Sequence, residues 1–262
     1  MIYNNVLEAV GHTPMIRLNR MVDEDCAEIL VKFEAVNVGG SIKTRTALNM
    51  IMDAEEKGII KEDTIIVEPT SGNQGIGLAL VGAVRGYKTV IIMPDSVSHE
   101  RKLLVEHYGA QVILIHDKGN IGDCIDECMQ TALKMANEDS KVFVPQQFAN
   151  PANPMVHRHH TGLEILEQVA GPIDGFCSGI GTGGTITGIG ETLKALNPDI
   201  TIWAVEPENA AILAGGTVGT HIQMGIGDGV VPDVLNQNIY NDIYIVSDEE
   251  ALRTAKDHAS IE

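Results

Sequence analysis

Basic residues are scarce in this sequence. Its 262 residues include 18 lysines and arginines against 36 aspartates and glutamates, which gives a formal net charge of −18. A surface this acidic repels nucleic-acid phosphates and anionic lipid headgroups, so we expect neither nucleic acid nor membrane as a partner. An anionic ligand would have to be held locally, by backbone N–H groups rather than by the field of the whole protein.

Cysteines are few, and long apolar runs are lacking. The four cysteines are scattered, and Cys124 and Cys128 lack the C-x-x-C spacing of a zinc site. His157, His159 and His160 have no cysteine or carboxylate placed to complete a metal site, so we expect no metal and a solvated or interface helix there. No apolar run approaches the roughly 20 residues of a membrane span. The first residues lack a signal-peptide pattern, so we expect reduced thiols in a cytoplasmic protein.

What the sequence does contain is a regular alternation of strand and helix patterns. Several runs are apolar throughout, as in parallel strands that are covered on both faces. The alternation predicts an α/β fold of doubly wound, mainly parallel sheets flanked by helices. The expected strands are Met15–Leu18, Ile29–Phe33, Thr64–Val67, Thr89–Met93, Gln111–Ile115, Lys141–Val144, Gly175–Ser178, Thr201–Val205 and Ile243–Val246. The expected helices are Ala47–Met52, Ile76–Val84, Glu100–His107, Ile121–Asn137, Pro154–Val169, Thr185–Ala195 and one capped at Ser247.

The most informative glycine-rich segment is Gly181-Thr182-Gly183-Gly184-Thr185, which follows an expected strand and opens a helix. Glycines let the backbone approach a ligand closely, and successive N–H groups at a helix start form a nest for a phosphate. The hydroxyls of Thr182 and Thr185 add donors. Residues 179–184 also satisfy the G-x-G-x-x-G spacing of a dinucleotide fingerprint, so the loop alone leaves a monophosphate and a nucleotide both open.

Two other turns carry residues suited to chemistry. Thr70, Ser71 and Asn73 gather short polar side chains at a helix start, which suits an amino-acid carboxylate, although such residues also serve as plain caps. Lys43 precedes an apolar helix and lies at its positive end. Most lysines in such a position are solvated surface residues. Positive potential and burial, however, depress the pKa of an ammonium group, and an imine-forming lysine has to be neutral.

Taken together, these segments resemble the fold-type II pyridoxal phosphate enzymes, whose fold is like that of the tryptophan synthase β subunit, and among them the cysteine synthase family. The resemblance covers nearly the whole chain. The motifs that carry it, in the order of the family, are Gly11-His12-Thr13-Pro14, Ser41-Ile42-Lys43, Thr70-Ser71-Gly72-Asn73, Gln147-Phe148-Ala149-Asn150-Pro151, Gly181–Thr185, Val205-Glu206-Pro207 and Gly225-Ile226-Gly227.

The resemblance implies roles for these residues. Lys43 would form the Schiff base with pyridoxal 5′-phosphate and move protons at the substrate α-carbon. Residues 181–185 would hold the phosphate, Asn73 would bond the 3′-oxygen of the ring, and the backbone of Gly225 would line the cleft. The residues implied to bind the substrate carboxylate are Thr70, Ser71, Asn73 and Gln147.

The implied reaction is β-replacement on a serine- or cysteine-type amino acid, with cysteine formation from O-acetylserine and sulfide as the first candidate. A homodimer is implied as well. A small mobile lobe would span residues 39–150, and residues 1–38 with 151–262 would form a larger lobe that binds the cofactor phosphate. The stretch 146–154, rich in Asn and Pro, is the expected crossover between them.

Two departures from the family matter. Asp228 stands where the family usually has a small residue; as a base toward water it would make the chain a cysteine lyase or desulfhydrase, although it could equally face solvent or cap a turn. The sequence stops at Glu262 within its last expected helix, where the family continues, so no residue is assigned to the pyridine nitrogen. If the chain ends there, weak cofactor binding and poor stability are expected. A nucleotide-binding regulatory module that uses the loop at Gly181 without chemistry is the alternative from another class.

Overall fold

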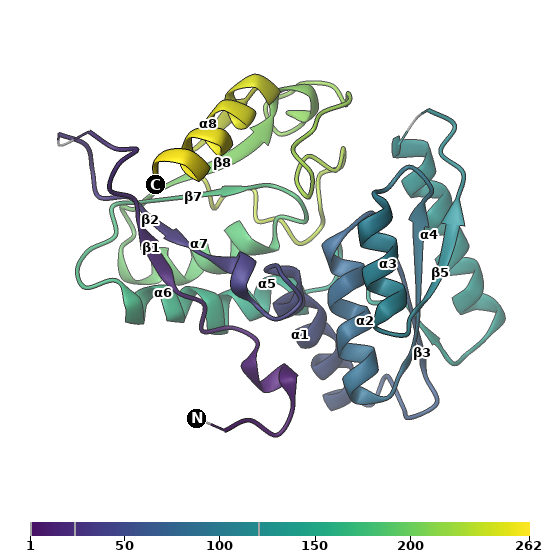
Figure 1. Cartoon of the computed structure of the whole chain (residues 1–262). Helices are drawn as coiled ribbons and strands as arrows, with labels where there is room; N and C mark the ends of the chain where they lie inside the picture. Colours follow the sequence, from purple (N-terminus) through teal and green to yellow (C-terminus); the bar gives the residue numbers. More distant parts are fainter. Residues whose placement is uncertain (1, 24, 120) are drawn as a thin grey trace. The chain divides into compact units, whose positions relative to one another are not determined.

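The computed structural model describes residues 2–23, 25–119 and 121–262, and the chain divides into two compact units (Figure 1). One unit comprises residues 1–11 and 35–153, and the other comprises residues 12–34 and 154–262. The segment up to Gly11 therefore clusters with the first unit, whereas the sequence grouped it with the larger lobe. That residues 39–150 form a small mobile lobe stays a prediction.

The first unit is built on a four-stranded parallel sheet in the order β5-β4-β3-β6. Its strands are β3 (Ile65–Pro69), β4 (Lys88–Pro94), β5 (Gln111–Ile115) and β6 (Val142–Phe143). Alternate residues of the central strands enter two separate cores, Ile66 and Ile91 on one face and Val67 and Ile92 on the other. The fully apolar runs of the sequence are thus explained by burial on both faces, as expected.

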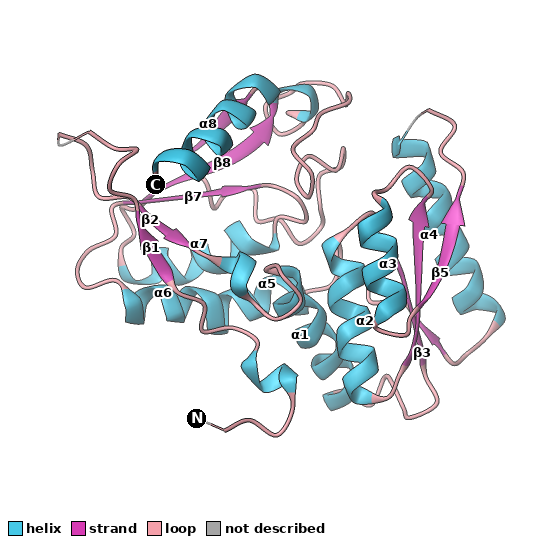
Figure 2. Ribbon diagram, in the orientation of Figure 1, coloured by secondary structure: helices cyan, strands magenta, loops and turns pink. Residues whose placement is uncertain are grey.

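Helices cover both faces of this sheet (Figure 2). The helices α1 and α2 contribute the core on the face of Ile66, and Cys128 and Ala132 of α4 fill the opposite face. The helical segments of this unit are η1 (Val6–Ala9), η2 (Glu34–Val36), α1 (Lys43–Glu56), α2 (Asn73–Arg85), α3 (His99–His107) and α4 (Ile121–Glu138).

The strand order of this sheet reverses between β3 and β6. From β3 the chain winds outward to β4 and β5 and then returns to place β6 on the other side. In doubly wound sheets such a reversal opens a crevice at the carboxyl ends of the two strands, where ligands bind. Here the segments that leave those two ends are Thr70–Asn73 and Gln146–Gln147.

The second unit has a three-stranded parallel sheet in the order β7-β8-β9. Its strands are β7 (Gly175–Gly179), β8 (Thr201–Pro207) and β9 (Asp242–Val246), and a separate antiparallel pair is formed by β1 (Met15–Arg17) and β2 (Leu30–Lys32). The remaining helices are α5 (Ala152–Val156), the π-helical turn η3 (His157–Thr161), α6 (Gly162–Gln168), α7 (Gly184–Leu196), η4 (Glu208–Ala210) and α8 (Asp248–Ile261). The predicted cap of the last helix is confirmed, because Ser247 and Glu250 form a capping box.

The segment expected to be one solvated or interface helix over residues 154–169 widens to a π-helix at 157–161. The interpretation of His157 as solvated is wrong: its side chain is buried, and its Nδ1 lies 3.0 Å from Oγ1 of Thr161. Gly188 of α7 makes this packing possible, since a methyl group there would lie 2.7 Å from the backbone nitrogen of Arg158. The other two histidines of the group, His159 and His160, are exposed.

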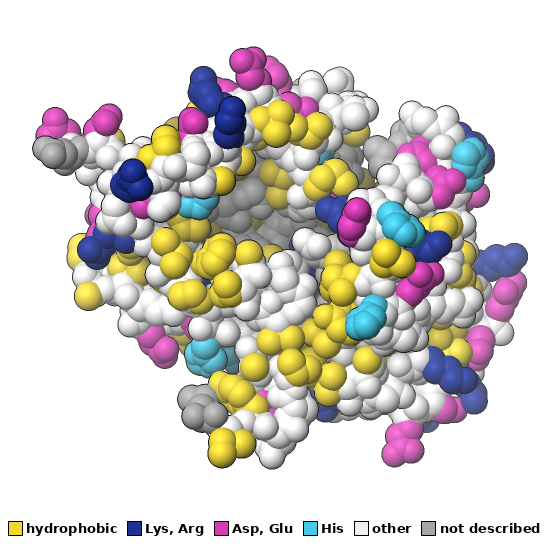
Figure 3. Space-filling model, in the orientation of Figure 1, with side chains coloured by type: hydrophobic (Ala, Val, Ile, Leu, Met, Phe, Trp, Pro, Cys, Tyr) yellow, Lys and Arg dark blue, Asp and Glu magenta, His cyan; other side chains and the backbone are white. Residues whose placement is uncertain are grey.

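Charged side chains are mixed on the surface. On the face drawn in Figure 3, lysines and arginines are scattered among acidic residues and form no basic patch. Within the described ranges, every helix is too short or too polar to cross a lipid bilayer.

Candidate active site

Lys43 is the first residue of α1, where the chain turns into the helix after Ser41. Its backbone N–H donates to Oγ of Ser41 (3.3 Å), and the residue is half-buried. The first turn of α1 lies directly against α2, because a methyl group on Gly77 would come 3.1 Å from the Lys43 carbonyl oxygen and 3.0 Å from Cβ of Ala47. A glycine at position 77 therefore permits the lysine-bearing turn to approach the start of α2.

The turn that precedes α2 carries the proposed carboxylate-binding residues. Thr70 is buried; its N–H donates to the carbonyl of Ile92 (2.9 Å), and its Oγ1 accepts from the N–H of Gly72 (3.2 Å). Ser71 is half-buried and Asn73, the first residue of α2, is exposed. One hydroxyl therefore stabilises the turn, while the amide of Asn73 remains accessible beside the positive end of the helix.

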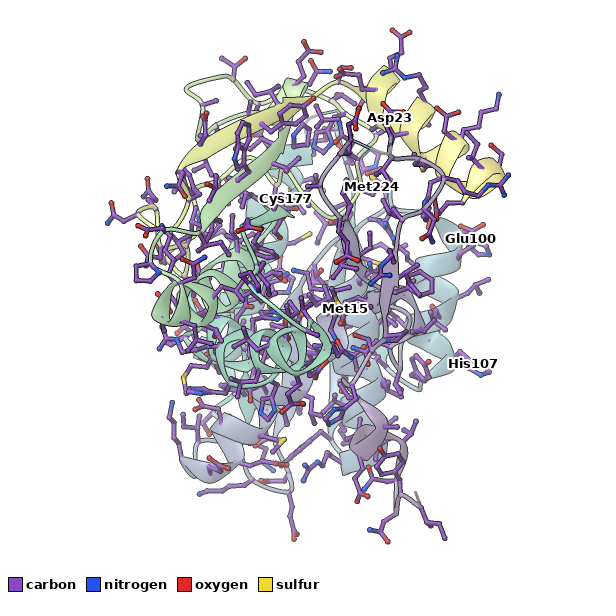
Figure 4. The ribbon with its side chains drawn as sticks, turned by 90° about the vertical axis from the view of Figure 1, so that its left-hand side faces the viewer. Met15, Asp23, Glu100, His107, Cys177 and Met224 are labelled. Carbon is purple, nitrogen blue, oxygen red and sulfur yellow. The ribbon has the colours of Figure 1, made fainter. Side chains whose placement is uncertain are left out.

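Arg101 of α3 holds this turn from outside, and the sequence reasoning missed it. Its Nη1 donates to the Ser71 carbonyl (3.2 Å), and its guanidinium carbon would lie 3.6 Å from a methyl group on Gly72. Figure 4 shows α3 running between the labelled Glu100 and His107. The contact adds a permanent positive charge next to the proposed carboxylate site.

Gln147 follows β6 and is buried. Its N–H donates to Oε1 of Glu68 (3.0 Å), and the N–H of Gln146 donates to Oε2 of the same carboxylate (2.9 Å). The Gln147 carbonyl accepts from Nδ2 of Asn153 (2.7 Å). Burial raises the pKa of the Glu68 carboxyl to about 7, against the lowering effect of the two N–H groups.

Glu68 is a second residue that the sequence reasoning missed. It lies on β3 two positions before Thr70, so one strand end contacts Gln147 and continues into the turn of Thr70. The available signal was a charged residue inside an otherwise apolar strand, since a carboxylate is rarely buried without a reason.

In the second unit, the loop after β7 forms a cradle of backbone. Gly183 has a φ of +75° and caps α7, and a methyl group on it would meet Cβ of Leu235 at 2.8 Å. Thr182 is buried, and its Oγ1 accepts from the N–H of Gly184 (3.4 Å); Thr185 is half-buried. The described first turn of α7 has no acidic residue, so its N–H groups suit an anion.

The segment from Gly225 to Asp228 lies against the same loop. A methyl group on Gly181 would come 2.6 Å from the Gly225 carbonyl oxygen and 3.3 Å from Oδ2 of Asp228. The N–H of Gly227 donates to the Ile180 carbonyl (2.8 Å). Asp228 is exposed, and Met224, labelled in Figure 4, directly precedes this segment. In the second unit, Gly181 therefore lies beside Gly225 and Asp228. That residues 181–185, Gly225 and Asp228 form one site stays a prediction.

A family model described as pyridoxal-phosphate dependent enzyme matches residues 6–262. The chain belongs to this family. A cysteine synthase of Staphylococcus aureus is 45% identical over 257 residues, which are 97% of this chain and 80% of that protein. A cysteine synthase structure from Entamoeba histolytica has a TM-score of 0.94 at 36% identity and covers 100% of this chain and 77% of that one. A hydrogen sulfide-producing enzyme from Fusobacterium nucleatum has a TM-score of 0.93 at 38% identity, over 100% of this chain and 85% of that one.

These comparisons confirm the predicted family and fold type. The protein is an enzyme that depends on pyridoxal phosphate, so the alternative of a nucleotide-binding module without chemistry is wrong. The cofactor of this family carries a single phosphate, which favours a monophosphate over a dinucleotide for the glycine spacing at 179–184.

The residues present fit this cofactor. Its phosphate requires backbone donors and room, and both Gly181 and Gly183 lie where a Cβ atom would meet a neighbouring atom within 2.8 Å. Its aldehyde requires an amine, for which Lys43 stands at the start of a described helix whose first turn has no acidic residue. The second unit thus offers a site that suits the phosphate, and the first unit offers an amine that suits the aldehyde.

Proposed function

We propose that the enzyme catalyses β-replacement on a serine- or cysteine-type amino acid, with cysteine formation from O-acetylserine and sulfide as the first candidate. Pyridoxal phosphate supplies an electron sink for the bond changes at the substrate α- and β-carbons. The names of the relatives support this reaction class. The observation that carries it is the close approach at Gly77, which packs the turn of Lys43 against the helix that follows the Thr70–Asn73 turn.

In this proposal the amine of Lys43 would hold the cofactor, and the same amine would move the proton at the substrate α-carbon. The N–H groups and hydroxyls of residues 181–185 donate to the phosphate. Asn73 donates to the 3′-oxygen of the ring, and the Gly225 backbone lines the cleft. The residues that orient the substrate carboxylate are Thr70, Ser71, Asn73 and Gln147.

The test of the cofactor site compares Lys43, the first residue of α1, with Lys57, the C-cap residue that follows its last turn. Purified protein incubated with pyridoxal phosphate should turn yellow, and borohydride followed by peptide mapping should find the cofactor fixed on Lys43. The Lys43→Ala variant should lose this label and all activity, because no other amine occupies that turn in the proposal. Lys57→Ala, at the exposed opposite end of α1, is the matched control and should keep both. Label retained in Lys43→Ala would refute the assignment.

A second reaction, conversion of cysteine and water to serine and hydrogen sulfide, is favoured by Asp228. Its Oδ2 lies 3.3 Å from the Cβ position built on Gly181, at the edge of the proposed phosphate cradle. As a base, the carboxylate would take a proton from water while a new C–O bond replaces the C–S bond. The hydrogen sulfide-producing relative supports this alternative.

The two reactions are separated by measuring sulfide released from cysteine and cysteine formed from O-acetylserine. The Asp228→Asn variant should lose sulfide release by 100-fold or more, in the range of roughly 10²–10⁴ for general base catalysis, while borohydride still fixes the cofactor. Asp233→Asn, an exposed aspartate of the same loop region, should leave both rates unchanged. Unaltered sulfide release in Asp228→Asn would leave β-replacement as the function.

We further infer that the enzyme acts as a cytoplasmic homodimer, which is what the family resemblance implies. The four cysteines are free among the described residues, in keeping with a reducing compartment. Light scattering on the cofactor-loaded protein should give twice the mass of one chain.

A further inference from the structure

Two buried glutamates end the central strands of the two sheets in the same way. Glu68 lies on β3 and Glu206 on β8, each after a valine and before a proline, and each strand has a neighbour on both sides. The Glu206 carboxylate accepts the N–H groups of Leu213 and Ala214, both at 3.1 Å. In the same way, the Glu68 carboxylate accepts the N–H groups of two consecutive residues, Gln146 and Gln147. In each unit, a carboxylate at a strand end therefore binds two consecutive backbone N–H groups of a loop, 7 and 8 positions along the chain for Glu206 and 78 and 79 positions along it for Glu68.

The turn that Glu68 binds has an unusual backbone. Gln146 has a φ of +56°, a left-handed conformation that non-glycine residues seldom adopt without support. The carbonyl of Gln146 accepts the N–H groups of Ala149 (3.0 Å) and Asn150 (2.9 Å), while its own N–H points to Glu68. Charge-assisted hydrogen bonds to two successive N–H groups are strong enough to hold such a turn.

We propose that Glu68 is a positioning residue, which fixes the Gln146–Gln147 turn and so places Gln147 to bind the carboxylate of the amino-acid substrate. The inference rests on the proposed function, which gives Gln147 that role. Glu68 acts through backbone and does not touch the substrate. Because the same strand end continues into Thr70, the residue sets the spacing between the two segments that flank the crevice.

The substitution that tests this is Glu68→Gln. Glutamine keeps one carbonyl oxygen but turns an N–H₂ group toward the second backbone N–H, so one of the two bonds is lost and two donors face each other. Glu68→Asp keeps the charge and removes one methylene, which shortens the reach. Val67→Ala is the matched control, because Val67 is the neighbouring buried residue, packs in the core between the sheet and α4, and has no side-chain group that could accept a hydrogen bond from the turn.

Two measurements are made on the cofactor-loaded enzyme. In Glu68→Gln, amide hydrogen exchange at Gln146 and Gln147 should accelerate at least tenfold, and KM for the amino-acid substrate should rise at least tenfold, with kcat changed less. In Val67→Ala both should stay at the wild-type level, which separates positioning from a general loss of stability. If Glu68→Gln does not fold, Glu68→Asp should show the same two changes at smaller size.

Wild-type exchange at Gln146 and Gln147 in both Glu68 variants would overturn the proposal. Faster exchange with an unchanged KM would overturn it as well, because the turn would then be held without serving the substrate. If the wild-type protein bound no cofactor, the proposed function would fail, whereas amide exchange would still decide whether Glu68 holds the turn.

Discussion

Replacing Glu68 by glutamine should change how the stability of the protein depends on pH. Burial raises the pKa of this carboxyl from 4.5 to about 7, so between those values the folded protein binds a proton more tightly than the unfolded chain does. Stability from this group is therefore greatest below pH 4.5 and is lost as the pH rises to about 7. Glutamine does not titrate, so the variant lacks this loss.

The size of the effect follows from the two pKa values. A difference of about 2.5 pH units, at about 1.4 kcal/mol for each, amounts to about 3 kcal/mol in the free energy of unfolding. The lost acceptor costs the variant about 1–3 kcal/mol at every pH. The difference in unfolding free energy, variant minus wild type, should therefore be negative near pH 4 and rise by about 3 kcal/mol by pH 8.

Urea unfolding followed across this pH range measures that difference directly. Glu138→Gln, at the exposed end of α4, serves as the control and should give a difference that does not change with pH. Parallel pH profiles for wild type and Glu68→Gln would refute the reasoning, because they would mean that Glu68 titrates alike in the folded and unfolded states.

Three further substitutions test other contacts. Gly181→Ala places a methyl group 2.6 Å from the Gly225 carbonyl and should weaken pyridoxal phosphate binding at least tenfold, about 1.4 kcal/mol, by equilibrium dialysis, with unchanged far-UV circular dichroism. Gly77→Ala crowds the Lys43 carbonyl and should lower the free energy of unfolding by about 1–3 kcal/mol and slow cofactor loading; a fully active, equally stable variant would contradict the packing argument. Glu206→Gln should lower the unfolding free energy by about 1–3 kcal/mol and speed amide exchange in its loop, and unaltered exchange would argue against its bonds.

The central strands β3 and β4 were predictable because the chain buries them on both faces. A continuous apolar run marks β4 at Lys88–Pro94 and β5 at Gln111–Ile115, and both lie within one residue of the expected ends. Helix starts were harder. The helix expected from Ala47 begins four residues earlier at Lys43, because polar residues in its first turn hide the apolar pattern. The antiparallel pairing of β1 with β2 depends on contacts that no local pattern records.

In the candidate site, too, features set by local sequence were predictable, whereas features set by contacts between distant residues were not. The glycine-containing turns after strands could be predicted from the sequence, because such turns require the residue types found at Thr70–Asn73 and at 181–185. The role of Glu68 could not be predicted from the sequence, because its hydrogen-bond partners lie 78 and 79 positions away along the chain. The π-helical turn at 157–161 was hidden for a similar reason, as it depends on the missing side chain of Gly188 in another helix.

The contact between Gly181 and the Gly225 carbonyl limits how the sequence of this site can evolve. There is no room for a further carbon atom between Gly181 and the Gly225 carbonyl. A side chain at position 181 is therefore tolerated only if the segment around Gly225 moves away. The segment that follows carries Asp228. Selection for a different reaction at that aspartate is therefore constrained by the loop that is proposed to bind the cofactor phosphate. The two segments are expected to vary together among descendants of this chain.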